Sequence, residues 1–278
     1  MELSFKTAKL FQRHIALPTD HGSWVFLISP LLIGLFAAPG WSLATVFLIV
    51  AAFAFFLIRQ PMTIAVKVYS KRRARRDLAP ASFWVLVYGL VGLLALVGLI
   101  LQGFGYLLIL ALPGVPVFAW HLYLVSRRSE RRQLGVEIVA TGILALAAPA
   151  AYWVAVGAPS LVGWWLLLLC WFQSAASIVY AYLRLEQRAL TALPDMATRI
   201  RMGSRALAYT SFNLLAVAGL GFAGILPPLL FVPYAVQWAE STRGVLRPAI
   251  GLRPTSIGVR QLIVSTLFTI LFILAWRI

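Results

Sequence analysis

Nine stretches of apolar residues follow one another along the chain, separated by short segments that hold most of the charged residues. The apolar stretches cover residues 22–39, 41–58, 82–102, 105–125, 135–156, 161–183, 206–221, 225–242 and 261–276. Most of them have about 18 to 22 residues, the length of helix that crosses the hydrocarbon core of a bilayer. The pattern predicts an all-α fold: a polytopic transmembrane helical bundle of about nine helices, in a single integral membrane domain over residues 1–278.

The basic residues predict how these helices are oriented. With the N-terminus in the cytoplasm, the inner segments are residues 1–21, 59–81, 126–134, 184–205 and 243–260, and they hold 23 of the 24 Lys and Arg residues. Only Arg277 falls on the outer side. Because positively charged loops stay in the cytoplasm, the sequence predicts nine helices with the N-terminus inside and the C-terminus outside. The expected location is the bacterial cytoplasmic (inner) membrane.

Residues 59–77, between the second and third apolar stretches, form the most basic of these segments. Met62, Ala65, Val66 and Tyr69 are spaced so that they share one face of a helix. A block of basic residues, 71–76, follows them. The pattern predicts a helix that lies on an anionic membrane surface.

The composition supports a membrane protein. Hydrophobic residues make up 62% of the chain and charged residues 12%, about half the charged share of a soluble domain. The net charge of +16 lies in short loops beside apolar stretches, which favours membrane lipids over nucleic acid as partners. Cys170 is the single cysteine, so the chain forms no internal disulfide and no cysteine metal site.

Residues 1–21 lack the apolar core of a signal peptide and are predicted to be a cytoplasmic amphipathic lead-in, with Leu10, Phe11 and Ile15 against the membrane surface. Within the apolar stretches, four prolines each remove a backbone hydrogen bond: Pro30, Pro113, Pro116 and Pro149. Kinks that improve packing and an internal cavity that receives the freed carbonyl groups both explain them.

Few polar side chains are available for chemistry, and those at helix ends fall on the predicted cytoplasmic side. His21 and Trp24 are three residues apart and could line the mouth of a pocket; equally, Asp20 could cap the helix while Trp24 anchors at the interface. His121 lies at a similar depth on another helix. Two histidines at one depth could ligate haem, which is a minor alternative, and no other cofactor is expected.

Glu137 begins the fifth apolar stretch, where the helix dipole would stabilise its charge. It could also face a cavity and pair with Arg59 or Lys67. Tyr182, Arg184 and Glu186 end the sixth stretch, where local ion pairing is the simplest explanation for the charges. These residues, with His21, Trp24 and His121, are the candidate ligand-binding residues.

The chain has no Gly-rich phosphate loop, nucleophile elbow, HExxH sequence or paired-Asp motif. We therefore assign no catalytic residue and expect no metal site, and the sequence favours a protein that is not an enzyme.

Four segments together resemble the YwiC-like family of bacterial membrane proteins. They are HGSWVFLISPLLIGL at residues 21–35, the basic stretch after the second apolar stretch, GVEIVATGILALAAPAAYW at 135–153 and RPTSIGVRQLIVSTLFTILF at 253–272. The opening HGxW before a proline-containing helix is the most specific of them. The resemblance implies a multi-pass membrane protein and no particular chemistry.

The predicted architecture also resembles the UbiA superfamily of intramembrane prenyltransferases, which have nine helices around a lipid-accessible cavity. Members carry Asp-rich motifs after the second and sixth helices, which bind Mg²⁺ and a prenyl diphosphate. At these places the chain has residues 59–67, without an acid, and residues 182–188, with Glu186 alone. Because Mg²⁺ needs carboxylate oxygens, metal-dependent prenyl transfer is not expected. An anionic headgroup could instead be held by Arg59, Lys67 and Arg184.

The leading hypothesis is that the protein binds an isoprenoid, a quinone or an anionic lipid in a cavity that opens to the cytoplasm. Three alternatives remain: a prenyltransferase that holds diphosphate without metal, a small transporter, and an accessory subunit of a respiratory complex. The sequence names no protein partner.

Overall fold

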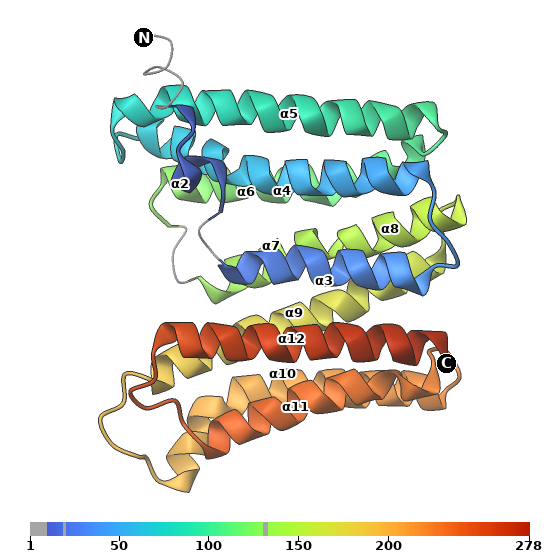
Figure 1. The fold of residues 1–278 in the computed structure, drawn as a ribbon. Coiled ribbons are helices and arrows are strands. Elements are labelled where there is room, and N and C mark those ends of the chain that lie inside the picture. The colour runs from blue at the N-terminus through green and yellow to red at the C-terminus, as the bar shows by residue number, and fades with distance from the viewer. Residues whose placement is uncertain (1–9, 19–20, 130–132) are drawn as a thin grey trace.

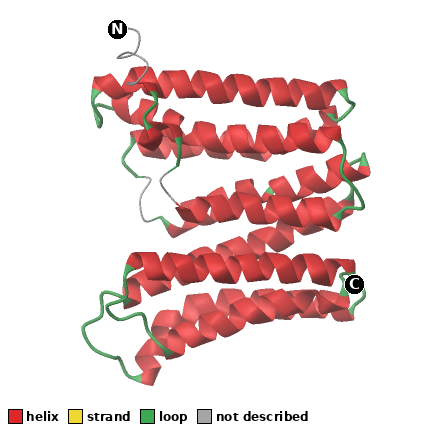
Figure 2. Cartoon of the chain, in the orientation of Figure 1, coloured by secondary structure: helices red, strands yellow, loops and turns green. Residues whose placement is uncertain are grey.

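The computed structural model of the chain describes residues 10–18, 21–129 and 133–278, and the regular elements among them are all helical (Figure 2). The α-helices are α2 (Arg13–Ala16), α3 (His21–Ala37), α4 (Leu43–Tyr69), α5 (Leu78–Leu101), α6 (Ala111–Ser126), α7 (Leu134–Ala145), α8 (Ala147–Val156), α9 (Leu161–Gln187), α10 (Met196–Phe222), α11 (Phe231–Leu246) and α12 (Pro254–Arg277). Three short 3₁₀ helices, η1 (Arg75–Asp77), η2 (Gly105–Leu110) and η3 (Pro228–Leu230), lie between them.

Each predicted apolar stretch lies in one of these helices or in two consecutive ones, so the all-α bundle is confirmed. Within the described residues, six helical segments are long and apolar enough to cross a membrane: Leu43–Tyr69, Arg75–Leu101, Gly105–Ser126, Leu134–Val156, Leu161–Gln187 and Pro254–Arg277. Helix α3 is a shorter apolar helix, and α10 and α11 have more polar residues. The chain is a membrane protein; crossing by all nine helices stays a prediction.

Prolines divide three of the predicted spans into two helical pieces. Pro113 is the third residue of α6, Pro149 the third of α8 and Pro233 the third of α11. A proline lacks the N–H of a helical hydrogen bond and its ring collides with the carbonyl group four residues earlier, whereas the first turn of a helix needs no such bond. The helix therefore restarts just before each proline.

The basic segments gather at one end of the bundle. Because successive long helices run in opposite directions, the connections α4–α5, α9–α10 and α11–α12 lie together at the left of Figure 1, beside the end of α6 and the start of α7. The C-terminus lies at the right. This arrangement agrees with the charge pattern that predicted the orientation. Which side of a membrane this end faces stays a prediction.

Residues 59–69 do not form the separate surface helix that we expected. They continue α4 without a break through Pro61, and a 3₁₀ turn follows at Arg75–Asp77. Their buried face is Pro61, Ile64 and Val68, while Tyr69 is 74% exposed. The helix face that we expected to be apolar, which includes Tyr69, is therefore not the face that packs against the rest of the protein.

Helix α2 covers this buried face of α4. Ile15 is fully buried against Ile64 and Ala81, so the prediction that Ile15 touches the membrane surface is wrong. The Trp84 indole donates to the carbonyl of Leu10 at 3.1 Å, and Tyr88 donates to that of Ala16 at 3.1 Å. The described part of the predicted lead-in thus docks on α4 and α5.

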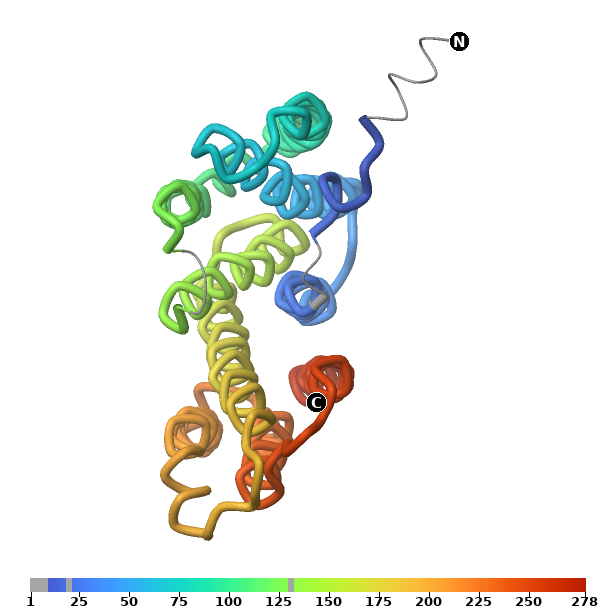
Figure 3. The backbone as a smooth tube through the Cα atoms, turned by 90° about the vertical axis from the view of Figure 1, so that its left-hand side faces the viewer, coloured from blue at the N-terminus to red at the C-terminus, as the bar shows by residue number. Residues whose placement is uncertain are grey.

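Helix α9 joins the two halves of the bundle. It packs against α7 and α8 on one side and against α10, α11 and α12 on the other (Figure 3). In an 18-residue apolar stretch of α9, 56% of the residues are buried. The corresponding shares are 17% for the segment that contains α5 and 6% for the segment that contains α6. Small and polar residues, which allow close packing between membrane helices, make up much of its buried surface: Gln173, Ser174, Ala175 and Ala176.

Helix α3 connects the halves a second time, because it packs on both α8 and α12. Gly34 lies so close to α8 that an added Cβ would be 2.2 Å from the carbonyl oxygen of Ala148. Toward α12, the hydroxyl groups of Ser29 and Thr269 are hydrogen bonded, and Arg277 donates to the carbonyl of Phe36 at 2.7 Å.

Candidate functional site

At the basic end of the bundle, α9, α11 and α12 surround a pocket of about 230 Å³. Four arginines line it together with aromatic and aliphatic residues. Its lining consists of Tyr180, Arg184, Arg243, Gly244, Arg247, Pro248, Ile250, Leu252 and Arg260. We call it the arginine pocket.

Arg184 forms the inner wall of the arginine pocket and is 7% exposed. Its Nη1 donates to the carbonyl oxygens of Gly244 at 3.0 Å and Arg247 at 2.8 Å, and to Gln187 Oε1 at 2.9 Å. The last carbonyl groups of a helix lack partners within the helix and carry partial negative charge, which a cation stabilises. Arg184 therefore caps the end of α11.

Gln187 completes this connection between α9 and α11. Its Nε2 donates to the Gly244 carbonyl at 3.1 Å, and its Oε1 accepts from the backbone N–H of Ala249 at 3.3 Å. The segment after α11, which carries Arg247, is thereby held against α9.

Glu240 on α11 is held by one residue from each neighbouring helix. Both of its oxygens accept from Arg260 of α12, and Oε1 also accepts from the Tyr180 hydroxyl of α9 at 2.8 Å. We call Tyr180, Glu240 and Arg260 the Glu240 triad. An arginine that meets a carboxylate with two parallel bonds is the strongest common ion-pair geometry.

Gly244 allows the Tyr180 ring to reach this position. A Cβ at residue 244 would lie 2.4 Å from the Tyr180 hydroxyl oxygen and 2.5 Å from a ring carbon. The Arg184 guanidinium lies 5.9 Å from the centre of the same ring.

The pocket has a strong excess of positive charge. Four arginines line it, no described carboxylate does, and the nearby Glu240 is already bound to Arg260. Arg243 and Arg247 are exposed, and neither forms an ion pair with a described acid. Arginine side chains in this arrangement suit phosphate and carboxylate groups.

Among the candidate ligand-binding residues predicted from the sequence, Arg184 lines the arginine pocket. Tyr182 and Glu137 do not line it and are bound to each other. The Tyr182 hydroxyl donates to Glu137 Oε1 at 2.6 Å, which links α9 to α7. Glu186 is exposed beside the buried Arg184.

The remaining predicted residues lie on helices of the other half. The Trp24 ring packs on Phe56 and Phe53 of α4, with ring centres 5.0 and 6.3 Å apart. Arg59 lies 5.2 Å from the centre of the Phe56 ring.

Lys67 is in the last turn of α4 and His121 is half-buried on α6, whereas the His21 side chain lies outside the described part. Within the described ranges, no three His, Cys, Asp or Glu side chains come together as a metal-binding group. Haem binding by His21 and His121 stays a prediction.

Sequence reasoning missed Arg243, Arg247 and Arg260 as site residues and used them only to orient the helices. One signal was present: Glu240, Arg243 and Arg247 are three and four residues apart, which places them on one helix face. The partner helices α9 and α12 could not be read from that spacing.

The match to a protein family falls in the N-terminal half of the chain, away from the arginine pocket. Residues 17–152 match the model of the YwiC-like protein family, and this range contains α3 to α7 and most of α8. Over these residues the chain is similar to the YwiC-like family. The resemblance that rested on residues 21–35 and 135–153 is thereby confirmed.

The arginine pocket lies beyond the YwiC-like segment, on α9, α11 and α12. A search of curated proteins gave no match, and a search of solved structures also gave none. The likeness to UbiA prenyltransferases therefore stays a prediction.

Proposed function

We propose that this YwiC-like membrane protein binds the anionic headgroup of a membrane lipid in the arginine pocket. The observation that carries the proposal is the set of four pocket arginines with no described carboxylate among the lining residues. Such a pocket in water would attract any anion. Here it lies at the ends of α9 and α12, two helices of membrane-spanning length, where lipid headgroups are abundant.

The lining also suits a molecule that is charged at one end and apolar at the other. Pro248, Ile250 and Leu252 lie beside the arginines. A phosphate or phosphodiester accepts several N–H groups at once, and apolar side chains next to it cover the first carbons of the lipid. A quinone has no charge for the arginines to neutralise, so among the predicted ligands we favour an anionic lipid or a prenyl phosphate.

We place this pocket on the cytoplasmic side of the bacterial inner membrane. The placement is supported by the gathering of basic segments at the same end of the bundle (Figure 1). Anionic lipids attract basic side chains beside a membrane segment with about 1 kcal/mol for each charge near the surface.

The test is native mass spectrometry of the purified full chain after addition of phosphatidylglycerol or phosphatidylcholine. We expect phosphatidylglycerol to bind and phosphatidylcholine to bind at least tenfold more weakly. The double variant Arg243→Gln/Arg247→Gln should lower phosphatidylglycerol binding about tenfold, because each exposed arginine contributes a modest charge-assisted contact.

The matched control is Arg201→Gln/Arg205→Gln, which removes two exposed charges from α10 at the same end of the bundle. It should leave lipid binding unchanged. Equal losses in the two double variants would mean that net charge, not the pocket, attracts the lipid, and the proposal would fail. A labelled prenyl diphosphate added with EDTA tests whether that anion binds without metal.

A further inference from the structure

Arg184 caps α11 through a single nitrogen atom of its guanidinium group. All of its hydrogen bonds to described residues come from Nη1. The other two nitrogens, Nε and Nη2, donate to no described residue, and neither is among the buried atoms that lack a partner, so both keep contact with open space. Because Arg184 is 7% exposed and lines the arginine pocket, this open space is the pocket.

The Nε and Nη2 atoms form one edge of a guanidinium group, and Arg260 shows how the same edge is used in this pocket. Arg260 donates from Nε and Nη2 to the two carboxylate oxygens of Glu240. Two oxygens of one anion match the two parallel N–H groups of this edge. The free edge of Arg184 therefore suits a second anion that presents two oxygens.

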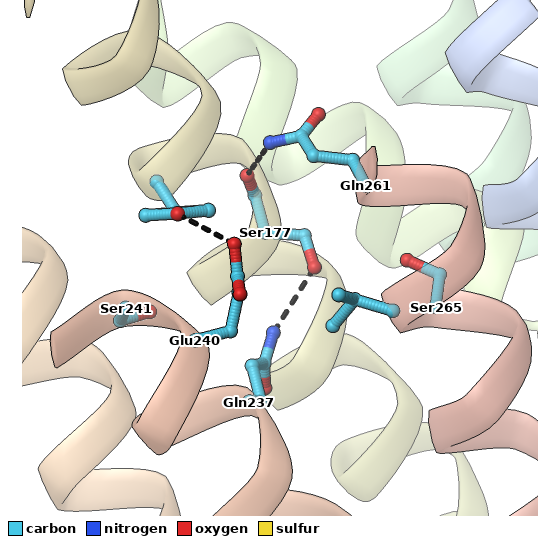
Figure 4. Close-up of a pocket in the computed structure, with 8 residues that line it drawn as sticks. Ser177, Gln237, Glu240, Ser241, Gln261 and Ser265 are labelled. Carbon is cyan, nitrogen blue, oxygen red and sulfur yellow. Dashed lines mark hydrogen bonds between the residues drawn. The ribbon is translucent and has the colours of Figure 1, made fainter. Parts of the chain in front are cut away.

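The positive charge of Arg184 is not compensated by any described carboxylate. Arg184 forms no ion pair with a described acid. Glu240 does not serve this purpose: Figure 4 shows it among polar side chains of α9, α11 and α12, where it accepts from Tyr180. A charge that is more than nine-tenths buried is costly unless a partner of opposite charge joins it. An anion that enters the arginine pocket would remove this cost.

The burial of Arg184 on the inner wall restricts the kind of phosphate that reaches it. A phosphodiester carries a carbon chain on both sides of the phosphorus, so its two free oxygens lie within the molecule. A phosphomonoester ends in its phosphate, which enters a pocket and meets an arginine on the inner wall. The volume of about 230 Å³ has room for such a terminal phosphate, which is the size of a few water molecules.

The charge of the arginine pocket also favours a phosphomonoester. Of the four arginines, Arg260 is neutralised by Glu240, which leaves the three positive charges of Arg184, Arg243 and Arg247. A phosphomonoester carries about 1.5 to 2 negative charges at pH 7, against about one for a phosphodiester. Two of its oxygens accept from the free edge of Arg184, and the third remains for the exposed Arg243 and Arg247.

We propose that Arg184 binds the ligand directly through Nε and Nη2, and that the ligand is a lipid with a terminal phosphomonoester. This inference rests on the proposed function, because it names the anion that the arginine pocket holds. Arg184 then has two roles: Nη1 caps α11, and the free edge binds phosphate. The binding makes and breaks no covalent bond.

The test compares phosphatidic acid, whose phosphate is terminal, with phosphatidylglycerol of the same acyl chains. Native mass spectrometry of the purified full chain with equal amounts of both lipids should show phosphatidic acid bound about tenfold more, through its extra charge and its two bonds to Arg184. This comparison uses the wild type, so its result does not depend on the folding of a variant. Equal binding of the two lipids would overturn the terminal phosphate as ligand.

The variant Arg184→Lys tests the free edge. Lysine keeps the positive charge and still donates to the carbonyls of Gly244 and Arg247, but it has no pair of parallel N–H groups. The preference for phosphatidic acid should fall to about twofold or less, while phosphatidylglycerol binding changes by less than about twofold. Retained phosphatidylglycerol binding also shows that the variant is folded. An unchanged preference would overturn direct binding by Arg184.

The matched control is Arg188→Lys, the same substitution one turn further along α9. Arg188 is exposed, does not line the arginine pocket, and donates from Nε to the Leu252 carbonyl at 3.3 Å. This variant should keep the full preference for phosphatidic acid. Equal losses in the two variants would overturn the specific role of Arg184.

The outcomes separate the inference from the proposed function. Equal binding of the two anionic lipids, with phosphatidylcholine bound at least about tenfold more weakly, would overturn the terminal phosphate and leave the arginine pocket as a site for anionic lipids. No preference for either anionic lipid over phosphatidylcholine would overturn the proposed function itself. Displacement of phosphatidic acid by an equal concentration of glycerol phosphate would overturn the lipid as ligand in favour of a soluble phosphomonoester.

Discussion

The guanidinium group of Arg184 donates to the backbone carbonyl of Arg247 at 2.8 Å, so a buried arginine on α9 holds the residue that follows α11. One arginine of the pocket thereby positions another. Arg184 acts through the backbone, which leaves the Arg247 side chain at the mouth of the pocket.

Arg184→Met should destabilise the protein by about 2 kcal/mol, because the carbonyls of Gly244 and Arg247 lose a buried donor. The measurement is thermal unfolding in detergent. Arg201→Met, which removes an exposed arginine from α10, should leave the melting temperature nearly unchanged. Equal melting temperatures for the Arg184 variant and the wild type would rule out the capping role.

Gly244→Ala should destabilise the protein by about 1–3 kcal/mol, because the new methyl group would collide with the Tyr180 ring. Moving the ring would also break the bond from Tyr180 to Glu240. Gly258→Ala on α12 is the control, since a Cβ there meets no atom within 4 Å. It should be neutral or stabilising by about 0.5–1 kcal/mol through helix propensity. A result in which the control is the more harmful change would contradict the close packing of Tyr180 on Gly244.

Gly34→Ala should be at least as harmful as Gly244→Ala, about 3 kcal/mol. Its Cβ would lie 2.2 Å from the backbone carbonyl oxygen of Ala148, which cannot rotate away as a side chain can. The α3–α8 contact would have to separate. Gly219→Ala on α10, where a Cβ has open space, should be tolerated in the same unfolding measurement.

The predicted orientation is tested with single cysteines in a Cys170→Ser background. An impermeant maleimide added to intact cells should label Ala158→Cys, in the exposed turn after α8. It should label Leu193→Cys, which is 61% exposed between α9 and α10, only after the cells are permeabilised. The reverse pattern would place the arginine pocket on the outer side and would contradict the positive-inside interpretation.

Much of the fold could be predicted from the sequence, because each helix of a membrane protein must be long and apolar enough to span and must satisfy its own backbone. The nine apolar stretches located the helices, and the distribution of bases anticipated that the basic segments lie at one end of the bundle (Figure 1). The prolines were recognised as interruptions, although the sequence did not show that Pro113, Pro149 and Pro233 each stand third in a restarted helix.

The extension of α4 through Pro61 was not predicted, because a basic amphipathic segment after an apolar one is also typical of a surface helix. What decided the matter was a contact with another part of the chain, the burial of Ile64 under Ile15. Sequence spacing carries no information about which distant segment covers a face.

The arginine pocket, too, could be predicted from the sequence only in part. The sequence by itself determined that bases would be concentrated at one end of a membrane bundle, and it selected Arg184 among them. Only the tertiary structure decided that Arg243, Arg247 and Arg260 join Arg184, and that Glu240 neutralises just one of the four. The physical reason is that a pocket depends on which helices pack together. Helices α9, α11 and α12 meet through Gly244, Gln187 and the Glu240 triad, and these contacts join residues about 20 to 60 positions apart in the sequence.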